Sequence, residues 1–168
     1  MTSRQMPGWL PWRLLARLYL PVLGIAAADA LTKKLALDVL FDPPRIIEVL
    51  PFLNLVPVWN SGVSFGFLRD AGAMMPYLLA LLAFAVACGL PLYARRWGNY
   101  SLLGALMMAG GAAGNGIDRL VYGRVVDFID FHAGGWHWPA FNLADIAITT
   151  GAGLIIVASL MEALNKER

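Results

Sequence analysis

Charged residues are scarce in this chain. They make up 14% of its 168 residues, whereas a water-soluble domain of this size carries about 25%. Hydrophobic residues make up 59% and the mean hydropathy is +0.64, which excludes a disordered chain, because disorder requires low hydrophobicity. The one cysteine, Cys88, excludes a disulfide framework and a cysteine-based metal site. A net charge of only +2 gives no indication of nucleic acid as a partner.

Long uncharged runs predict membrane-spanning helices. Twenty-four uncharged residues separate Asp70 from Arg95, and 21 separate Arg96 from Asp118. Either run can cross a hydrocarbon core of ~30 Å at 1.5 Å per residue. A run near the C-terminus reaches this length when residues 141–145 are added to it, and the first apolar stretch is interrupted by charges. We therefore expect an all-α membrane protein, a single domain over residues 1–168, with four transmembrane helices at about 14–37, 73–94, 98–117 and 141–162.

The distribution of charge predicts the orientation of these helices. Segments 1–17, 95–96 and 162–168 hold seven basic and two acidic residues, for a net charge of +5, and the rest of the chain holds six basic and nine acidic residues, for −3. Because basic segments stay in the cytoplasm, we expect both termini there. A cleaved signal peptide is the alternative for the first helix. Asp29 and Lys33 beside the cleavage site favour a retained helix.

The two loops on the outer side differ in character. The loop at 38–72 holds apolar segments at 45–50 and 52–59 between prolines, which indicates short strands that form a small β platform on the membrane surface. For the loop at 118–140 we expect a short loop or helix. Its Trp136 and Trp138 are typical anchors at the membrane interface.

Polar residues at membrane depth are costly and therefore indicate function. In this chain they gather at the outer ends of the predicted helices and in the outer loops, so the topology brings them into one layer. They are Asp29, Thr32, Lys33, Asn60, Ser61, Asn115, Asp118, Arg119, Asp127, Asn142 and Asp145, and Gly62 lies beside Asn60 and Ser61. Residues four apart share a helix face, and we interpret the charged residues at 29, 33, 118 and 119 as ion pairs that hold the helices together.

Asp127 and Asp145 have apolar neighbours and no obvious ion-pair partner. Two carboxylates a few ångströms apart cannot both ionise cheaply. One then serves as acid and the other as base, the arrangement that activates water against a peptide bond. The alternatives are a helix-capping role for Asp145 after Asn142 and a solvated loop acid at Asp127 beside Arg124.

Other chemistries fit the sequence less well. Gly62 to Gly66, with Ser64 at the centre, matches a nucleophile elbow, but that turn requires an α/β sheet. His132 and His137 lack the spacing of a zinc motif. A small proton-coupled membrane transporter would have acids near mid-span and an internal repeat. The predicted second to fourth helices have no acid at mid-span.

The ordered polar motifs resemble those of the lipoprotein signal peptidase family, signal peptidase II. The matching segments are 29–33, 60–62, 114–119, 125–128 and 141–145. The resemblance implies an aspartic endopeptidase of the bacterial inner membrane that faces the periplasm. Such an enzyme removes the signal peptide of diacylglyceryl-modified prolipoproteins by cutting before the lipidated cysteine. The implied partners are these prolipoproteins and membrane lipids, with no cofactor or metal and a monomeric chain.

The resemblance also assigns roles to residues. Asp127 and Asp145 align with the catalytic pair. Pocket residues would be Asn60, Gly62, Asn115, Asp118, Arg119 and Asn142, and Asp29 and Lys33 would brace the first helix. The chain departs from the family pattern at Ala30, Trp59, Val63 and Ser64, which bears on substrate preference.

Overall fold

The computed structural model describes residues 12–62 and 74–166. Within them the chain forms four helices and a four-stranded antiparallel sheet. The elements in chain order are α1 (Trp12–Leu40), β1 (Ile47–Leu50), β2 (Leu53–Asn60), α2 (Met75–Ala94), α3 (Asn99–Tyr122), β3 (Val125–Ala133), β4 (Trp136–His137) and α4 (Leu143–Lys166). The expected helical fold with a small sheet is confirmed.

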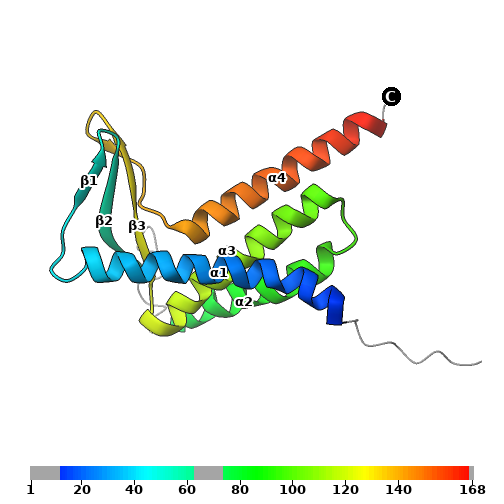
Figure 1. Ribbon diagram of the computed structural model, residues 1–168, viewed down its shortest axis with the longest axis horizontal. Helices are drawn as coiled ribbons and strands as arrows, with labels where there is room; N and C mark the ends of the chain where they lie inside the picture. The colour runs from blue at the N-terminus through cyan, green and yellow to red at the C-terminus, as the bar shows by residue number, and fades with distance from the viewer. Residues whose placement is uncertain (1–11, 63–73, 167–168) are drawn as a thin grey trace, which may run out of the picture.

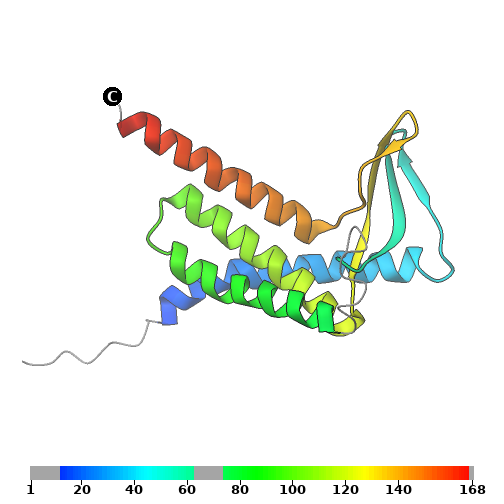
Figure 2. The same cartoon turned by 180° about the vertical axis from the view of Figure 1, so that it is seen from behind.

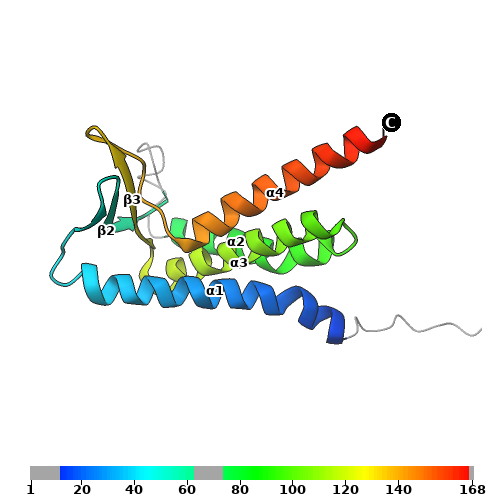
Figure 3. The same ribbon diagram turned by 45° about the horizontal axis from the view of Figure 1, so that its top comes forward.

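The helices lie along one another, and the sheet stands at one end of them (Figure 1). The view from behind shows the same arrangement, with the turn between α2 and α3 at the opposite end (Figure 2). Seen from a third direction, α4 diverges from the other helices toward the C-terminus (Figure 3). The end of α1, the end of α3 and the start of α4 therefore meet at the sheet.

Helix α3 is the central helix of the bundle. It contacts α1, α2 and α4, and its apolar residues Leu106 and Ala109 pack with Leu18 and Val22 of α1. Of the described helices, α1, α2 and α4 are long and apolar enough to cross a membrane. Although the sequence predicts a span at 98–117, α3 does not reach that hydropathy, because five glycines and several polar side chains lie within it. Small residues suit a central helix, since they allow neighbouring backbones to approach closely.

The sheet joins both outer loops, although the sequence indicated strands only in the first of them. Its strand order is β1-β2-β3-β4, and β2 from the first loop pairs antiparallel with β3 from the second, with Val58 opposite Asp127. The second loop thus forms strands where we expected a short loop or helix. Its residues 125–129 are mostly β-branched or aromatic, a composition that favours a strand once a partner is available.

A glycine ends α3 and starts the approach to β3. Gly123 has φ +70°, and its N–H donates to Arg119 O at 3.1 Å. This left-handed C-terminal cap favours glycine, because a Cβ is strained in that conformation. The chain can therefore reverse within a few residues and enter the sheet, which brings Asp127 back to the ends of the helices.

The packing of α3 against α4 generates a stability prediction. A Cβ at Gly111 would meet the carbonyl oxygen of Ala144 and lie 2.8 Å from Ile148 Cγ1. We expect Gly111→Ala to lower the free energy of unfolding by about 1–3 kcal/mol, because backbone must shift to relieve the overlap. Thermal unfolding of the purified protein in detergent measures the change. Gly153→Ala in α4 is the control, since a Cβ there meets nothing within 4 Å. Equal effects of the two substitutions would show that the α3–α4 contact is not this close.

Candidate active site

A buried group of three charges joins α1 to α3. Lys33 Nζ lies 2.7 Å from Asp29 Oδ2, one turn away on α1, and 2.9 Å from Asp118 Oδ2 on α3. The three side chains are at most 7% exposed. The expected pairing of Asp29 with Lys33 is confirmed. Asp118 pairs with Lys33 across helices. The interpretation of Arg119 as a member of an ion pair is wrong within the described residues, because its guanidinium donates to a backbone carbonyl oxygen instead.

The same two carboxylates hold the backbone beside the predicted catalytic pair. Asp118 Oδ2 accepts a hydrogen bond of 3.0 Å from the N–H of Val126, the residue before Asp127. Asp29 Oδ1 accepts one of 2.9 Å from the N–H of Ala144, the residue before Asp145. The charge group therefore fixes the position of both β3 and the start of α4.

The first of the pair, Asp127, lies on β3 and is 1% exposed. Its two oxygens accept hydrogen bonds from the amide groups of Asn60, at 2.8 Å, and Asn142, at 2.7 Å. Burial raises the pKa of Asp127 and the charge of Asp145 raises it further, while the two amides lower it, with a net result of about 6. Asp127 therefore holds a proton at a higher pH than an ordinary aspartate.

The second, Asp145, lies in the first turn of α4 and forms a reciprocal cap with Asn142. The N–H of Asn142 donates to Asp145 Oδ2 at 3.2 Å, and the N–H of Asp145 donates to Asn142 Oδ1 at 3.0 Å. The capping interpretation of Asp145 is therefore confirmed. Its Oδ1 also accepts a hydrogen bond of 2.8 Å from Asn115 Nδ2. Asp145 lines a cavity of about 350 Å³ with Trp138, Phe141, Ile146, Thr149 and Thr150.

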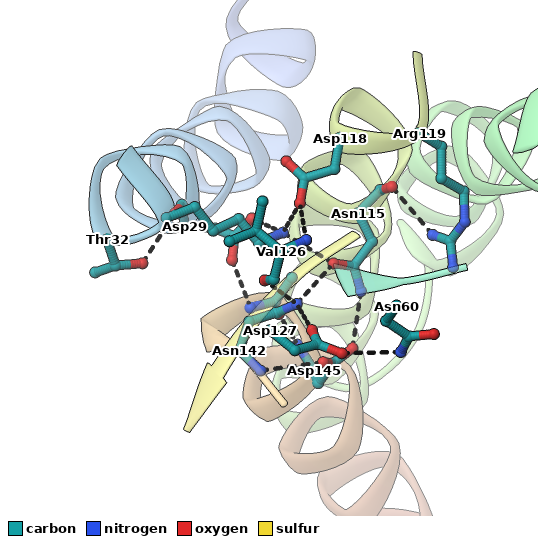
Figure 4. A network of polar contacts seen from close by, with 12 residues as sticks. Asp29, Thr32, Asn60, Asn115, Asp118, Arg119, Val126, Asp127, Asn142 and Asp145 are labelled. Atoms are coloured by element: carbon teal, nitrogen blue, oxygen red, sulfur yellow. Dashed lines mark hydrogen bonds and ion pairs between the residues drawn. The ribbon is translucent and has the colours of Figure 1, made fainter. Parts of the chain in front are cut away.

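Asn142 brings the two carboxyl groups together. It is fully buried, its side-chain amide donates to Asp127, and its backbone and side chain bond to Asp145. Figure 4 shows Asp127 and Asp145 beside each other, with Asn142, Asn60 and Asn115 around them. Among the described residues no lysine, arginine or histidine forms an ion pair with either carboxyl. The side-chain hydrogen-bond partners of the pair are thus neutral amides, which permits one carboxyl to stay protonated while the other ionises.

The remaining predicted residues lie around this pair. Arg119 Nη1 donates to Asn115 O at 3.0 Å, and the N–H of Gly62 donates to Asn60 Oδ1 at 2.7 Å. A Cβ at Gly62 would lie 3.3 Å from Arg119 Nη2, so these two residues are adjacent. Val63 and Ser64, and with them the nucleophile-elbow interpretation, lie outside the described residues.

A second polar cluster on the sheet was not predicted. Asp130 on β3 is 5% exposed, accepts a hydrogen bond of 3.2 Å from Asn54 on β2, and lies 2.9 Å from His137 Nδ1 on β4. Burial raises the pKa of its carboxyl, but the contacts with His137 and Asn54 outweigh this and leave the pKa below its usual value. The cluster ties three strands together. Its sequence signal was the two histidines, His132 and His137, that follow Asp130 closely and were weighed as zinc ligands.

Other site contacts had no sequence signal. The N–H groups of Val126 and Ala144 belong to apolar residues, and a Cβ at Gly114 would overlap the carboxylate of Asp29. No group of three or more histidine, cysteine, aspartate or glutamate side chains lies within metal-binding reach in the described part of the chain.

The bundle of apolar helices and the two adjacent carboxyl groups are features of a membrane-embedded protein with a polar site at one end of its helices. A family model described as signal peptidase (SPase) II matches residues 22–161. The chain therefore belongs to the signal peptidase II family, as the sequence motifs indicated.

Individual relatives agree with this assignment. The chain is 43% identical over 146 residues to a lipoprotein signal peptidase of Burkholderia thailandensis, with 83% of this chain and 87% of the relative covered. A lipoprotein signal peptidase of Paraburkholderia phymatum matches to the same extent. Among solved structures, a bacterial membrane enzyme determined by the in meso method has a TM-score of 0.70 and 28% identity, with coverage of 90% of this chain and 92% of that one.

The buried charge group generates a second stability prediction. Lys33→Met leaves two buried carboxylates without their cation, so we expect a loss of about 3–5 kcal/mol in the free energy of unfolding. Denaturant or thermal unfolding in detergent measures it. Lys34→Met is the matched control, because Lys34 pairs with Asp38 on the exposed face of α1 and an exposed pair contributes little. Similar losses for both variants would contradict the importance of the buried group.

Proposed function

We propose that the protein is an aspartic endopeptidase that removes the signal peptide of diacylglyceryl-modified prolipoproteins, cutting before the lipidated cysteine. Family membership supports the substrate class. The observation that carries the catalytic type is the contact of one buried residue, Asn142, with both Asp127 and Asp145. The proposal needs no metal ion or organic cofactor, because two carboxyl groups and water suffice for peptide hydrolysis.

Asp127 is the proposed acid and Asp145 the proposed base. Asp127 is the buried member with the raised pKa, and Asp145 faces the cavity. In the first step Asp145 accepts a proton from water as the water oxygen bonds to the carbonyl carbon, and Asp127 gives its proton to the carbonyl oxygen. In the second step the carbon–nitrogen bond breaks, the leaving amine takes the proton from Asp145, and Asp127 regains a proton from the hydroxyl group.

The surroundings of the pair suit a lipid-modified substrate. A groove of about 330 Å³ is lined by apolar residues of α2, α3 and α4, and Asn115 and Arg119 also line it. An acyl chain in such a groove would leave the cleavable bond beside polar donors, among them Arg119, whose buried Nε has no partner within the described residues. We propose that Asn60, Gly62, Asn115, Asp118, Arg119 and Asn142 shape this pocket, with Asp29 and Lys33 as supports.

The proposed location is the bacterial inner membrane, with both termini in the cytoplasm, the carboxyl pair facing the periplasm and the chain acting as a monomer. The excess of basic residues in the terminal segments and at 95–96 supports this orientation. A transporter has no comparable support. Its acids would be expected at mid-span, whereas Asp145 lies in the first turn of α4 and Asp118 in the final turns of α3.

The catalytic assignment predicts the loss of activity on neutral substitution. Asp127→Asn and Asp145→Asn, made separately, remove the acid and keep the shape, so we expect cleavage of a diacylglyceryl-modified prolipoprotein to fall by roughly 10²- to 10⁴-fold or more. The mobility shift of the cleaved product on a gel measures the rate. Asp38→Asn, an exposed acid on α1, is the control and should cleave normally. Near-normal cleavage by Asp127→Asn or Asp145→Asn, with the fold intact, would show that this aspartate is not catalytic.

The pH dependence tests the assignment of the acid. Asn60 donates a hydrogen bond to Asp127, which stabilises the ionised carboxylate and lowers its pKa. Asn60→Ala should therefore raise the pKa of Asp127 and extend the protonated form to higher pH. We expect the alkaline limb of the rate profile to move upward by about 1 pH unit. Ser61→Ala, at the exposed neighbour, should leave the profile in place. An unmoved or downward-shifted limb would refute Asp127 as the acid.

A further inference from the structure

A second polar cavity lies at the end of the bundle opposite the carboxyl pair. It has a volume of about 350 Å³ and lies between the turn that joins α2 to α3 and the final turns of α4. Figures 1 and 2 show this turn at the far end of the helices from the sheet. The lining residues are Arg96, Trp97, Gly98, Ser101, Ile155, Ser159 and Glu162. Neither the carboxyl pair nor its supporting residues contribute to it.

Two opposite charges line this cavity without neutralising each other. Arg96 and Glu162 both contribute to its wall, yet they form no ion pair with each other or with any other described residue. The carboxylate of Glu162 lies against the turn, since a Cβ at Gly98 would be 2.9 Å from its Oε1. A ligand with a negative and a positive group could pair with both Arg96 and Glu162.

The wall also contains unused hydrogen-bonding groups. Ser101 is only 6% exposed, lines the cavity, and its hydroxyl forms none of the side-chain hydrogen bonds found in the described part of the chain. It lies in the first turn of α3, whose N-cap residue Gly98 provides no side-chain cap. The first-turn N–H groups of a helix lack intrahelical partners and attract anions. Arg96, Ser101 and this helix end therefore offer positive charge and hydrogen-bond donors to an anionic group.

The residues around the cavity suit a lipid as the ligand. Trp97 packs edge-on against Tyr93 with their ring centroids 5.5 Å apart, and tryptophan and tyrosine concentrate at headgroup depth. Ile156 and Leu160 of α4, close in sequence to the lining residues Ile155 and Ser159, are exposed apolar side chains. A lipid with its headgroup in the cavity could thus have its acyl chains along α4.

We propose that this cavity binds the zwitterionic headgroup of a phospholipid that carries a primary amine. The phosphate lies at Arg96, Ser101 and the start of α3, and the ammonium lies at Glu162. The lipid belongs to the leaflet opposite the carboxyl pair. This site is independent of the proposed peptidase activity.

Native mass spectrometry of the delipidated full chain in detergent tests the proposal. We expect phosphatidylethanolamine to be retained more strongly than phosphatidylglycerol, which has no amine, and than phosphatidylcholine, whose methylated amine cannot donate hydrogen bonds. Glu162→Gln should reduce retention of phosphatidylethanolamine by about tenfold and leave phosphatidylglycerol unchanged, while Arg96→Gln should weaken both. Arg95→Gln and Glu48→Gln are the matched controls, because these exposed residues do not line the cavity.

Several outcomes would overturn the proposal. Equal retention of the three lipids would show that the site does not recognise the amine. Equal effects of Arg95→Gln and Arg96→Gln would show that lipids bind only by unspecific charge attraction. Free phosphoethanolamine, added at the same concentration, should bind far more weakly. If it binds as well as the lipid, the ligand is a soluble zwitterion. Thermal unfolding checks binding independently. Phosphatidylethanolamine should raise the unfolding temperature of the unsubstituted chain but not that of Glu162→Gln, and the unfolding transition of the variant shows that it folds.

Discussion

The contact on which the site depends is the sharing of one ammonium group, that of Lys33, between Asp29 and Asp118. Each of these charges would cost several kcal/mol to bury alone. Together the three charges form two ion pairs. Asp29 also accepts a hydrogen bond from the N–H of Ala144, and Asp118 accepts one from the N–H of Val126. The arrangement of β3 and α4 is therefore set by charges that take no part in the proposed hydrolysis.

Asn115 separates this charge group from the carboxyl pair. Its Oδ1 accepts a hydrogen bond of 2.9 Å from Lys33, and its Nδ2 donates one of 2.8 Å to Asp145. An ammonium in direct contact with Asp145 or Asp127 would favour ionisation of that carboxyl. The neutral amides of Asn115, Asn142 and Asn60 instead orient the carboxyl groups. The amides of Asn60 and Asn142 lower the pKa of Asp127 by less than burial raises it. A charged support and a neutral lining are thus different parts of one network (Figure 4).

The two ends of the bundle have different structures because different elements close them. At one end a sheet covers the helices and buries Asp127, with apolar side chains such as Phe52, Phe131 and Trp136 exposed on its outside. At the other end a short turn leaves Arg96 and Glu162 beside an open cavity. Exposed apolar residues on the sheet suit contact with a membrane surface, so both ends of the protein have features that suit lipid headgroups.

The sequence by itself determined the features that depend on near neighbours. Apolar runs gave the helices, a spacing of four predicted the pair Asp29 and Lys33, and Asn142 three residues before Asp145 predicted the cap. The ordered motifs gave the family, because five matches along one chain are specific even without a structure.

Only the tertiary structure decided which distant residues meet. Asn60 and Asp127 are 67 positions apart, and Lys33 and Asn115 are 82 apart. The strand around Asp127 forms because β2 from the other loop pairs with it, and α3 is central despite its low hydropathy because three helices cover it. The spacing of residues along the sequence predicts on which face of its own helix or strand a side chain lies. The pairing of elements follows from packing and from the burial of charge, which act across the whole chain.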